Sequence, residues 1–283
     1  MIPHLSEKGY ICVLNNKGNA LRGLGKLQAQ LSEFKAAKQS YFDAIAACNS
    51  SLLIAPDDIC ALNNKGKALL SLGDLQAQLS EFEDAKQSYF EALAACNSVL
   101  LIAPDDIGVL NNKGKALLSL GDLQAQLSEF EAAKQSYFEA IAAYNSVLLI
   151  APDFIAALTN KGKALVRLGY LQEKLSERQE ALKNWQKALE MFDRSLAIAP
   201  NCELVRNNRD VLQKYLNNLG RSQLVKVWHS GGGFVQLTYT ESSQDLRTPT
   251  KKPGFWPNLR ITTKYYRKNP VSGPHASALR LDT

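Results

Sequence analysis

The apolar residues of this chain recur at steps of three and four, which is the spacing of one face of an α-helix. The pattern is clearest after Asp106, which can cap the start of a helix. Five residues then fall on one face: Ile107, Leu110, Gly114, Leu117 and Leu120. Because glycine commonly follows the end of a helix, we predict that this helix ends at Gly121.

A second apolar stripe follows and predicts a longer helix. It begins near Leu123 and ends at about Ile150, before Pro152, which cannot continue a helix. The stripe consists of Leu123, Leu127, Phe130, Tyr137, Ile141, Tyr144 and Leu148. We favour an unbroken helix of about 28 residues, which would be about 42 Å long. The alternative is a break near Ser128, where Ser128 and Glu131 have the spacing of a capping box.

The two predicted helices form a unit that repeats every 48 residues. LNNKGNAL begins at Leu14, LNNKGKAL begins at Leu62 and Leu110, and LTNKGKAL begins at Leu158. The segments 62–105 and 110–153 differ at only three positions, which indicates recent duplication. The fourth copy has diverged further, so the residues that it keeps are more informative. Internal repetition of helical pairs predicts an α-solenoid.

The repeated glycines carry a family resemblance. Gly18, Gly66, Gly114 and Gly162 each precede Ala-Leu, a Leu-Gly pair follows seven residues later, and Ala-Pro closes each unit. This pattern resembles the tetratricopeptide repeat over roughly residues 8–200. The resemblance implies an all-α, right-handed solenoid of helix–turn–helix repeats. The family unit has 34 residues, and we place the 14 additional residues inside the second helix, where they add nearly four whole turns.

This reading divides the chain into two domains. The repeats are expected over about 8–56, 57–104, 105–152 and 153–200, with a capping helix over 201–219 that completes a solenoid over 1–220. The remainder, 221–283, is a basic tail with ten Lys and Arg against three Asp and Glu. We expect it to be mostly irregular, although the alternating stretches 224–228 and 234–240 have the pattern of a β-hairpin.

The cysteines do not have the pattern of a metal site or of disulfides. Cys12 and Cys60 lie 48 residues apart, and so do Cys48 and Cys96. Later repeats carry Gly, Ala, Tyr or Phe at these positions, so we interpret them as packing positions. We expect no metal and no cofactor.

Neither catalysis nor membrane insertion is predicted. The three histidines lie outside the repeats, and none of the common hydrolase, nucleotide-binding or zinc motifs occurs. We therefore expect that the protein is not an enzyme. The first 15 residues lack the pattern of a signal peptide, and no apolar run approaches the length of a membrane span. We expect a cytoplasmic location.

The candidate binding residues lie on the first helix of each repeat, opposite its apolar face. The resemblance implies that the first helices line a concave groove and that an asparagine row holds the backbone of an extended peptide. Amide side chains both donate and accept hydrogen bonds, which suits a peptide group. The lysines favour an acidic partner. The candidate peptide-binding residues are Asn16, Asn64, Asn112, Asn160, Lys67, Lys115, Lys163 and Arg167. A solvated helix face copied by duplication is an equally good interpretation.

The sequence therefore predicts a protein-interaction scaffold that binds a protein or peptide in its groove, and the lysines favour an acidic one. One alternative is a scaffold whose basic tail binds nucleic acid or an anionic surface, because 221–283 carries the positive charge. Another alternative is a structural, self-associating array.

Overall fold

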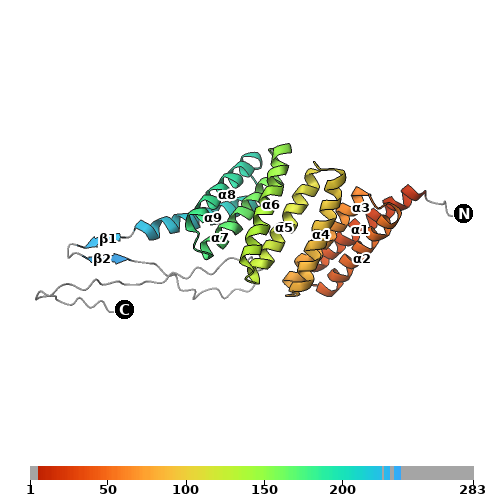
Figure 1. Ribbon diagram of the computed structural model, residues 1–283, viewed down its shortest axis with the longest axis horizontal. Helices are drawn as coiled ribbons and strands as arrows, with labels where there is room; N and C mark the ends of the chain where they lie inside the picture. Colours follow the sequence, from red (N-terminus) through yellow and green to blue (C-terminus); the bar gives the residue numbers. More distant parts are fainter. Residues whose placement is uncertain (1–5, 225, 230–232, 237–283) are drawn as a thin grey trace, which may run out of the picture. The chain divides into compact units, whose positions relative to one another are not determined.

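The computed structural model describes residues 6–224, 226–229 and 233–236, with side chains described over residues 6–219. This part of the chain contains nine consecutive α-helices followed by two short strands (Figure 1). The helices are α1 (Glu7–Gln30), α2 (Phe34–Ile54), α3 (Ile59–Gln78), α4 (Phe82–Ile102), α5 (Ile107–Gln126), α6 (Phe130–Ile150), α7 (Ile155–Lys174), α8 (Arg178–Ile198) and α9 (Glu203–Leu224). The chain divides into two compact units, Met1–Leu212 and Gln213–Thr283.

The helices α1 to α8 form four helical pairs that stack in sequence order (Figure 1). Each first helix packs on its own second helix, and each second helix packs on the next first helix. Successive first helices also contact one another, whereas no comparable contact joins the second helices within the described residues. Because the first helices approach more closely, their layer forms the inner side of the stack. The prediction of an all-α solenoid of tetratricopeptide-like helical pairs is confirmed for this unit.

The prediction of one unbroken second helix is wrong. The alternative, a break near the serine of each repeat, is confirmed. The break falls at Ser32, Ser80, Ser128 and Ser176, whose φ angles of 63–67° place them in the left-handed region. In the third repeat, the Glu129 amide donates to the Gln124 carbonyl oxygen at 2.8 Å. This bond spans the chain reversal and satisfies a carbonyl at the end of α5, as in a helix C-cap of the Schellman type.

The helices of a repeat are consequently similar in length, with 20 residues in α5 and 21 in α6. The additional residues of the 48-residue unit lengthen both helices. The capping box does not form either, because Glu129 occupies the N-cap of α6 and makes no side-chain capping bond. The predicted aspartate cap is confirmed at Asp106, which accepts from the amide of Val109. Asp58 caps α3 in the same way by accepting from the amide of Cys60.

Gly121 lies inside α5 and does not end it, contrary to the prediction. A Cβ atom at Gly121 would lie 2.7 Å from Cε1 of Tyr137. The same close approach occurs between Gly73 and Tyr89, at 2.7 Å. These glycines are needed where the tyrosine ring of the second helix packs on the backbone of the first.

The core lies between the layers and continues from repeat to repeat. Tyr137 of α6, for example, packs with Leu168 and Leu171 of the following α7, and all three are buried. Cys48 and Cys96 are buried, free thiols that fill positions between the helices of a pair, as the sequence predicted. Burial raises the pKa of both thiols to about 11.

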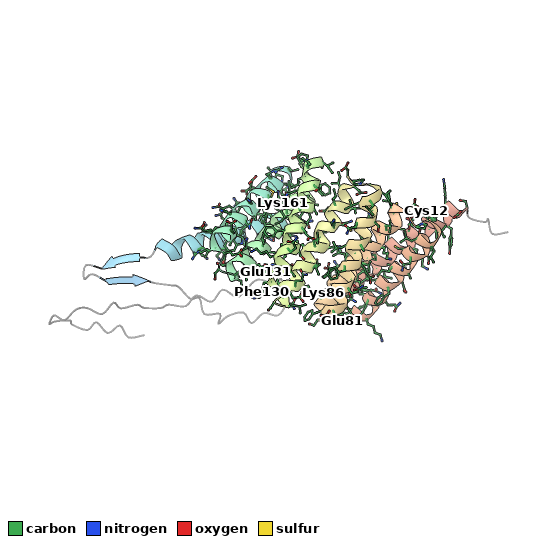
Figure 2. The ribbon with its side chains drawn as sticks, in the orientation of Figure 1. Cys12, Glu81, Lys86, Phe130, Glu131 and Lys161 are labelled. Atoms are coloured by element: carbon green, nitrogen blue, oxygen red, sulfur yellow. The ribbon has the colours of Figure 1, made fainter. Side chains whose placement is uncertain are left out.

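Each junction between repeats also carries an ion pair at the start of the second helices. Lys38 contacts Glu81 at 2.5 Å, and the Nζ of Lys86 lies 2.9 Å from a carboxylate oxygen of Glu129. Figure 2 shows Glu81 and Lys86 near the same edge of the stack. Because these side chains keep partial contact with water, the pairs contribute modestly and mainly align neighbouring repeats.

The second unit is described only in part. α9 continues through Gly220 to Leu224, beyond the predicted end of the capping helix. Strands β1 (Lys226–His229) and β2 (Gly233–Gln236) pair antiparallel, with Val227 opposite Val235. This pairing is the hairpin that the alternating pattern predicted. The rest of the predicted basic tail, on which the nucleic-acid alternative depends, lies outside the described residues.

Candidate peptide-binding surface

Four positions on each first helix form a polar stripe along the inner layer. Their spacing of three, four and three residues places them on one helical face. On α3 they are Asn64, Lys67, Ser71 and Asp74, and on α5 they are Asn112, Lys115, Ser119 and Asp122. On α7 they are Asn160, Lys163, Arg167 and Tyr170, and on α1 they are Asn16, Asn19, Gly23 and Lys26. We call this set the first-helix stripe.

The asparagines of the stripe connect neighbouring repeats. The Nδ2 atom of Asn112 donates to Oδ1 of Asn63 at 3.1 Å, and that of Asn160 donates to Oδ1 of Asn111 at 3.2 Å. Asn64 makes a longer bond, 3.4 Å, to the carbonyl oxygen of Asn15. The Oδ1 atoms of Asn64, Asn112 and Asn160 accept no hydrogen bond from the residues that the structure describes. The row is therefore partly structural, and it still offers acceptors.

Asn16 differs because no described repeat precedes it. It is exposed, and its Nδ2 atom contacts Sγ of Cys12 in the same helix at 3.6 Å. The predicted row of four asparagines thus consists of three bridging residues and one that is bound only within α1.

The lysines of the stripe lie near cations of the neighbouring repeats. Burial lowers the pKa of Lys67, and the nearby charges of Arg22 and Lys115 add to this effect, whereas Asp106 opposes it. Burial likewise lowers the pKa of Lys163, with Lys115 and Arg167 adding to it. These effects show that cations of successive repeats face the same space, where an anionic group would relieve their repulsion.

Arg167 is placed differently from the lysines. Its Nε atom lies 3.2 Å from Oδ1 of Asp122 in the preceding repeat. The structure therefore brings the predicted asparagines and lysines into neighbouring rows, while Arg167 is held by a carboxylate at the edge of the stripe.

Two aspartates of the stripe were missed by the sequence analysis. Tyr89 donates to Asp74 at 2.9 Å, and Tyr137 donates to Asp122 at 2.8 Å. Partial desolvation of its carboxyl group raises the pKa of Asp74 to about 6, although hydrogen bonds from Tyr89 and Ser119 favour the charged form. Asp74 remains accessible to solvent, which weakens this effect.

The signal for these aspartates was present in the repeat. Asp74 and Asp122 lie 48 residues apart, ten residues after Asn64 and Asn112, which continues the helical spacing of the stripe. They were overlooked because the preceding glycine was interpreted as the end of the helix. Once the first helix is extended to Gln126, Asp122 joins the face that carries the asparagine and the lysine.

No group of His, Cys, Asp and Glu side chains with the geometry of a metal site occurs in the described residues. Within the same residues, no helix is long and apolar enough to cross a membrane.

Comparisons with known proteins identify one family model. The model described as "Plant specific mitochondrial import receptor subunit TOM20" matches residues 90–226, which run from α4 to the start of β1. Among curated proteins, no match to the chain was found. The solved structure titled "MamA RS-1 ArsTM double mutant" is 19% identical and has a TM-score of 0.33, with 62% of this chain and 75% of that chain covered.

The family match contradicts the expectation of a cytoplasmic location, because the matching model describes a mitochondrial import receptor subunit. The expectation rested on the lack of a signal peptide and of a membrane span, and neither pattern distinguishes the cytoplasm from the surface of an organelle.

Proposed function

We propose that this protein is a non-enzymatic receptor or scaffold that binds a segment of another polypeptide along the first-helix stripe. The observation that carries this proposal is the recurrence of Asn, Lys and a third polar residue on the first helices α3, α5 and α7. Because these helices contact one another, their stripes form neighbouring rows. A polypeptide that crosses the rows meets the same groups several times.

The chemistry of the rows suits an extended peptide. The Oδ1 atoms of the bridging asparagines can accept from peptide N–H groups, while the lysines can bind carboxylates. Each neutral hydrogen bond contributes only about 0.5–1.5 kcal/mol, so repetition supplies the affinity. We propose that lysines outweigh aspartates along the stripe and that acidic segments bind best.

The family match supports the receptor role. The matching family is named for a subunit of a mitochondrial import receptor, so we propose proteins destined for mitochondria as the class of partner. Transit peptides are Arg-rich and poor in acidic residues. They would contact Asp74 and Asp122, whereas the lysine rows would bind acidic segments elsewhere in such a protein.

A binding experiment with paired variants tests this function. The variant K67Q/K115Q/K163Q removes three charges from the stripe. The matched control K17Q/K65Q/K113Q removes three charges from another face of the first helices. Fluorescence anisotropy with the full chain would compare an extended Glu-rich peptide with an Arg-rich amphipathic one.

We expect the stripe variant to weaken binding of the Glu-rich peptide about tenfold or more, and the control to bind as the unmodified chain does. Equal weakening by both variants would show that net charge alone drives binding. If the Arg-rich peptide binds more tightly and D74N/D122N abolishes this binding, the stripe is still the binding surface. The proposed preference for acidic segments would then be wrong.

A further inference from the structure

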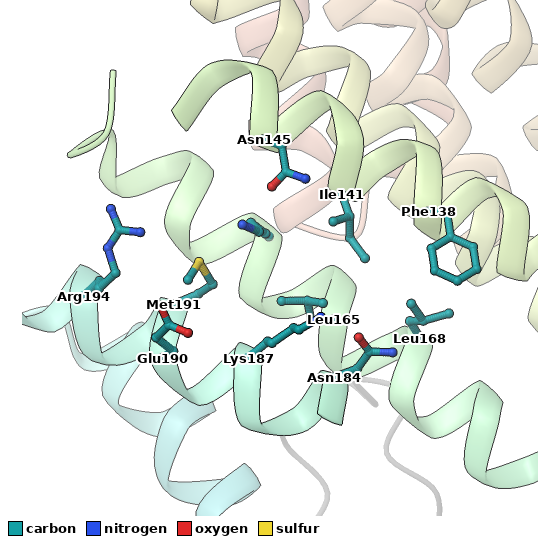
Figure 3. A pocket seen from close by; sticks show the side chains of 11 residues that line it. Phe138, Ile141, Asn145, Leu165, Leu168, Asn184, Lys187, Glu190, Met191 and Arg194 are labelled. Carbon is teal, nitrogen blue, oxygen red and sulfur yellow. The ribbon is translucent and has the colours of Figure 1, made fainter. Parts of the chain in front are cut away.

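A hollow lies away from the first-helix stripe, between the second helices α6 and α8 (Figure 3). Its volume is about 420 Å³, and α7 lies beneath it. Ile141, Leu165, Leu168 and Met191 provide an apolar lining. Such a surface accommodates a large apolar side chain.

Three of the remaining side chains around the hollow are cationic. Lys161 comes from α7, while Lys187 and Arg194 come from α8, and Glu190 is the single acidic residue that lines it. Arg194 is anchored by a 3.0 Å hydrogen bond from Nη2 to the carbonyl oxygen of Pro152. Neither lysine lies within 4.0 Å of a carboxylate oxygen of the described residues.

The pKa of Lys161 reflects this surplus of positive charge. Burial lowers its pKa first, Arg194 and Lys187 lower it further, and Glu190 opposes them. A carboxylate placed beside Lys161 would offset the positive charge that Glu190 offsets only in part.

The preceding repeat provides an internal comparison. The counterparts of Lys187, Glu190 and Arg194, 48 residues earlier, are Glu139, Ala142 and Ser146. Lys161 corresponds to Lys113, and the apolar residues Leu165 and Leu168 correspond to Leu117 and Leu120. Met191 corresponds to the smaller Ala143, so the floor stays apolar, while the four rim positions change from neutral overall to a net charge of +2. Because the preceding repeat folds with the other residues, the solenoid does not require these cations.

We propose that the hollow between α6 and α8 binds an acidic peptide segment that places one large apolar side chain on the floor and carboxylates at the rim. Lys187 and Arg194 are seven residues apart on one helix, a rise of about 10 Å. A peptide with separated carboxylates can reach both cations, whereas a ligand with a single anionic headgroup reaches one. This site is independent of the first-helix stripe.

The test uses the full chain carrying K67Q/K115Q/K163Q, so that the stripe does not contribute. The probe is a fluorescein-labelled eight-residue peptide of Glu and Asp with two leucines. A second peptide replaces every acid by its amide. The variant K187E/R194S installs the residues of the preceding repeat, which that repeat already tolerates. We expect it to weaken binding of the acidic peptide at least tenfold and the amide peptide to bind at least tenfold more weakly.

The converse variant, E139K/S146R, installs the two cations between α4 and α6. We expect titration calorimetry to show a second site for the acidic peptide, weaker than the first because Ala143 replaces Met191 on its floor. Unchanged binding by K187E/R194S, or equal binding of the amide peptide, would overturn the proposal. Saturable binding of dodecanoate with no binding of the peptide would overturn it too, and would assign the hollow to a small amphiphile. None of these results depends on whether the stripe binds its own partner.

Discussion

Asn112 of α5 donates its side-chain amide to Oδ1 of Asn63 in the preceding repeat, at 3.1 Å. A residue expected to be reserved for a partner thus also joins two repeats. The Oδ1 atom of the same amide group remains available as an acceptor. One side chain can therefore join two repeats and also bind a partner.

The bridging asparagines predict a cost in stability. Replacing Asn64, Asn112 and Asn160 with Ala removes three hydrogen bonds between repeats. We expect the free energy of unfolding to fall by roughly 1.5–4.5 kcal/mol, at about 0.5–1.5 kcal/mol for each bond. The matched control N49A/N97A/N145A changes exposed asparagines of the second helices and should have little effect. Urea unfolding followed by circular dichroism measures both, and equal costs would show that the bridges add nothing.

The packing between repeats predicts a large difference between two equivalent leucines. Leu75 of α3 is 3% exposed because the preceding repeat covers it, whereas Leu27, 48 residues earlier on α1, is 53% exposed. We expect Leu75→Ala to cost about 2–5 kcal/mol and Leu27→Ala less than about 1 kcal/mol. Thermal unfolding of the two variants provides the comparison. Similar losses would mean that Leu27 is also covered in solution.

Replacing glycine with alanine is expected to have opposite effects on stability at Gly121 and at Gly23. Gly121→Ala drives a Cβ atom to within 2.7 Å of the Tyr137 ring, so we expect a loss of about 1–3 kcal/mol from overpacking. A Cβ atom added at Gly23 of α1 would have no neighbour within 4 Å among the described residues, so Gly23→Ala should stabilise the helix by about 0.5–1 kcal/mol. Thermal unfolding compares the two variants, and a neutral result at Gly121 would contradict the close packing of Tyr137.

Asp74 predicts a dependence of stability on pH. Its pKa is raised from 3.8 to about 6 in the folded protein, so folding favours the protonated carboxyl. The stabilisation of the folded protein by the protonated carboxyl is complete below pH 3.8, and it is lost as the pH rises through about 6. Asp74→Asn removes this dependence, and its melting temperature should rise relative to the unmodified chain between about pH 4 and pH 7. An unchanged difference between the two proteins over this range would show that the pKa of Asp74 is not raised.

Much of the fold follows from the sequence because the signals are local. The aspartate caps at Asp58 and Asp106, and the apolar spacing through Tyr137 and Tyr144, depend on one helix at a time. The break at Ser128 was only the alternative to the favoured unbroken helix, because serine is an uncommon residue for a left-handed C-cap and because the apolar period continues across the turn.

The binding surface was only partly predictable for a different reason. The helical face that carries Asn112 and Lys115 follows from spacing within one helix. The bond from Asn112 to Asn63 depends on how far one repeat is displaced along the next, which no single-helix pattern contains. The pairing of Tyr137 with Asp122 depends in the same way on the angle between α5 and α6.

The first-helix stripe is tested most directly by photo-crosslinking of a bound peptide. A benzophenone amino acid would replace Ser119, in the middle of the stripe, or Ser98, on the second helix α4. We predict that the Glu-rich peptide is crosslinked at position 119 and not at position 98, and that K67Q/K115Q/K163Q removes the crosslink. Crosslinking at position 98 with none at position 119 would contradict the account, because the peptide would then bind on the layer of second helices.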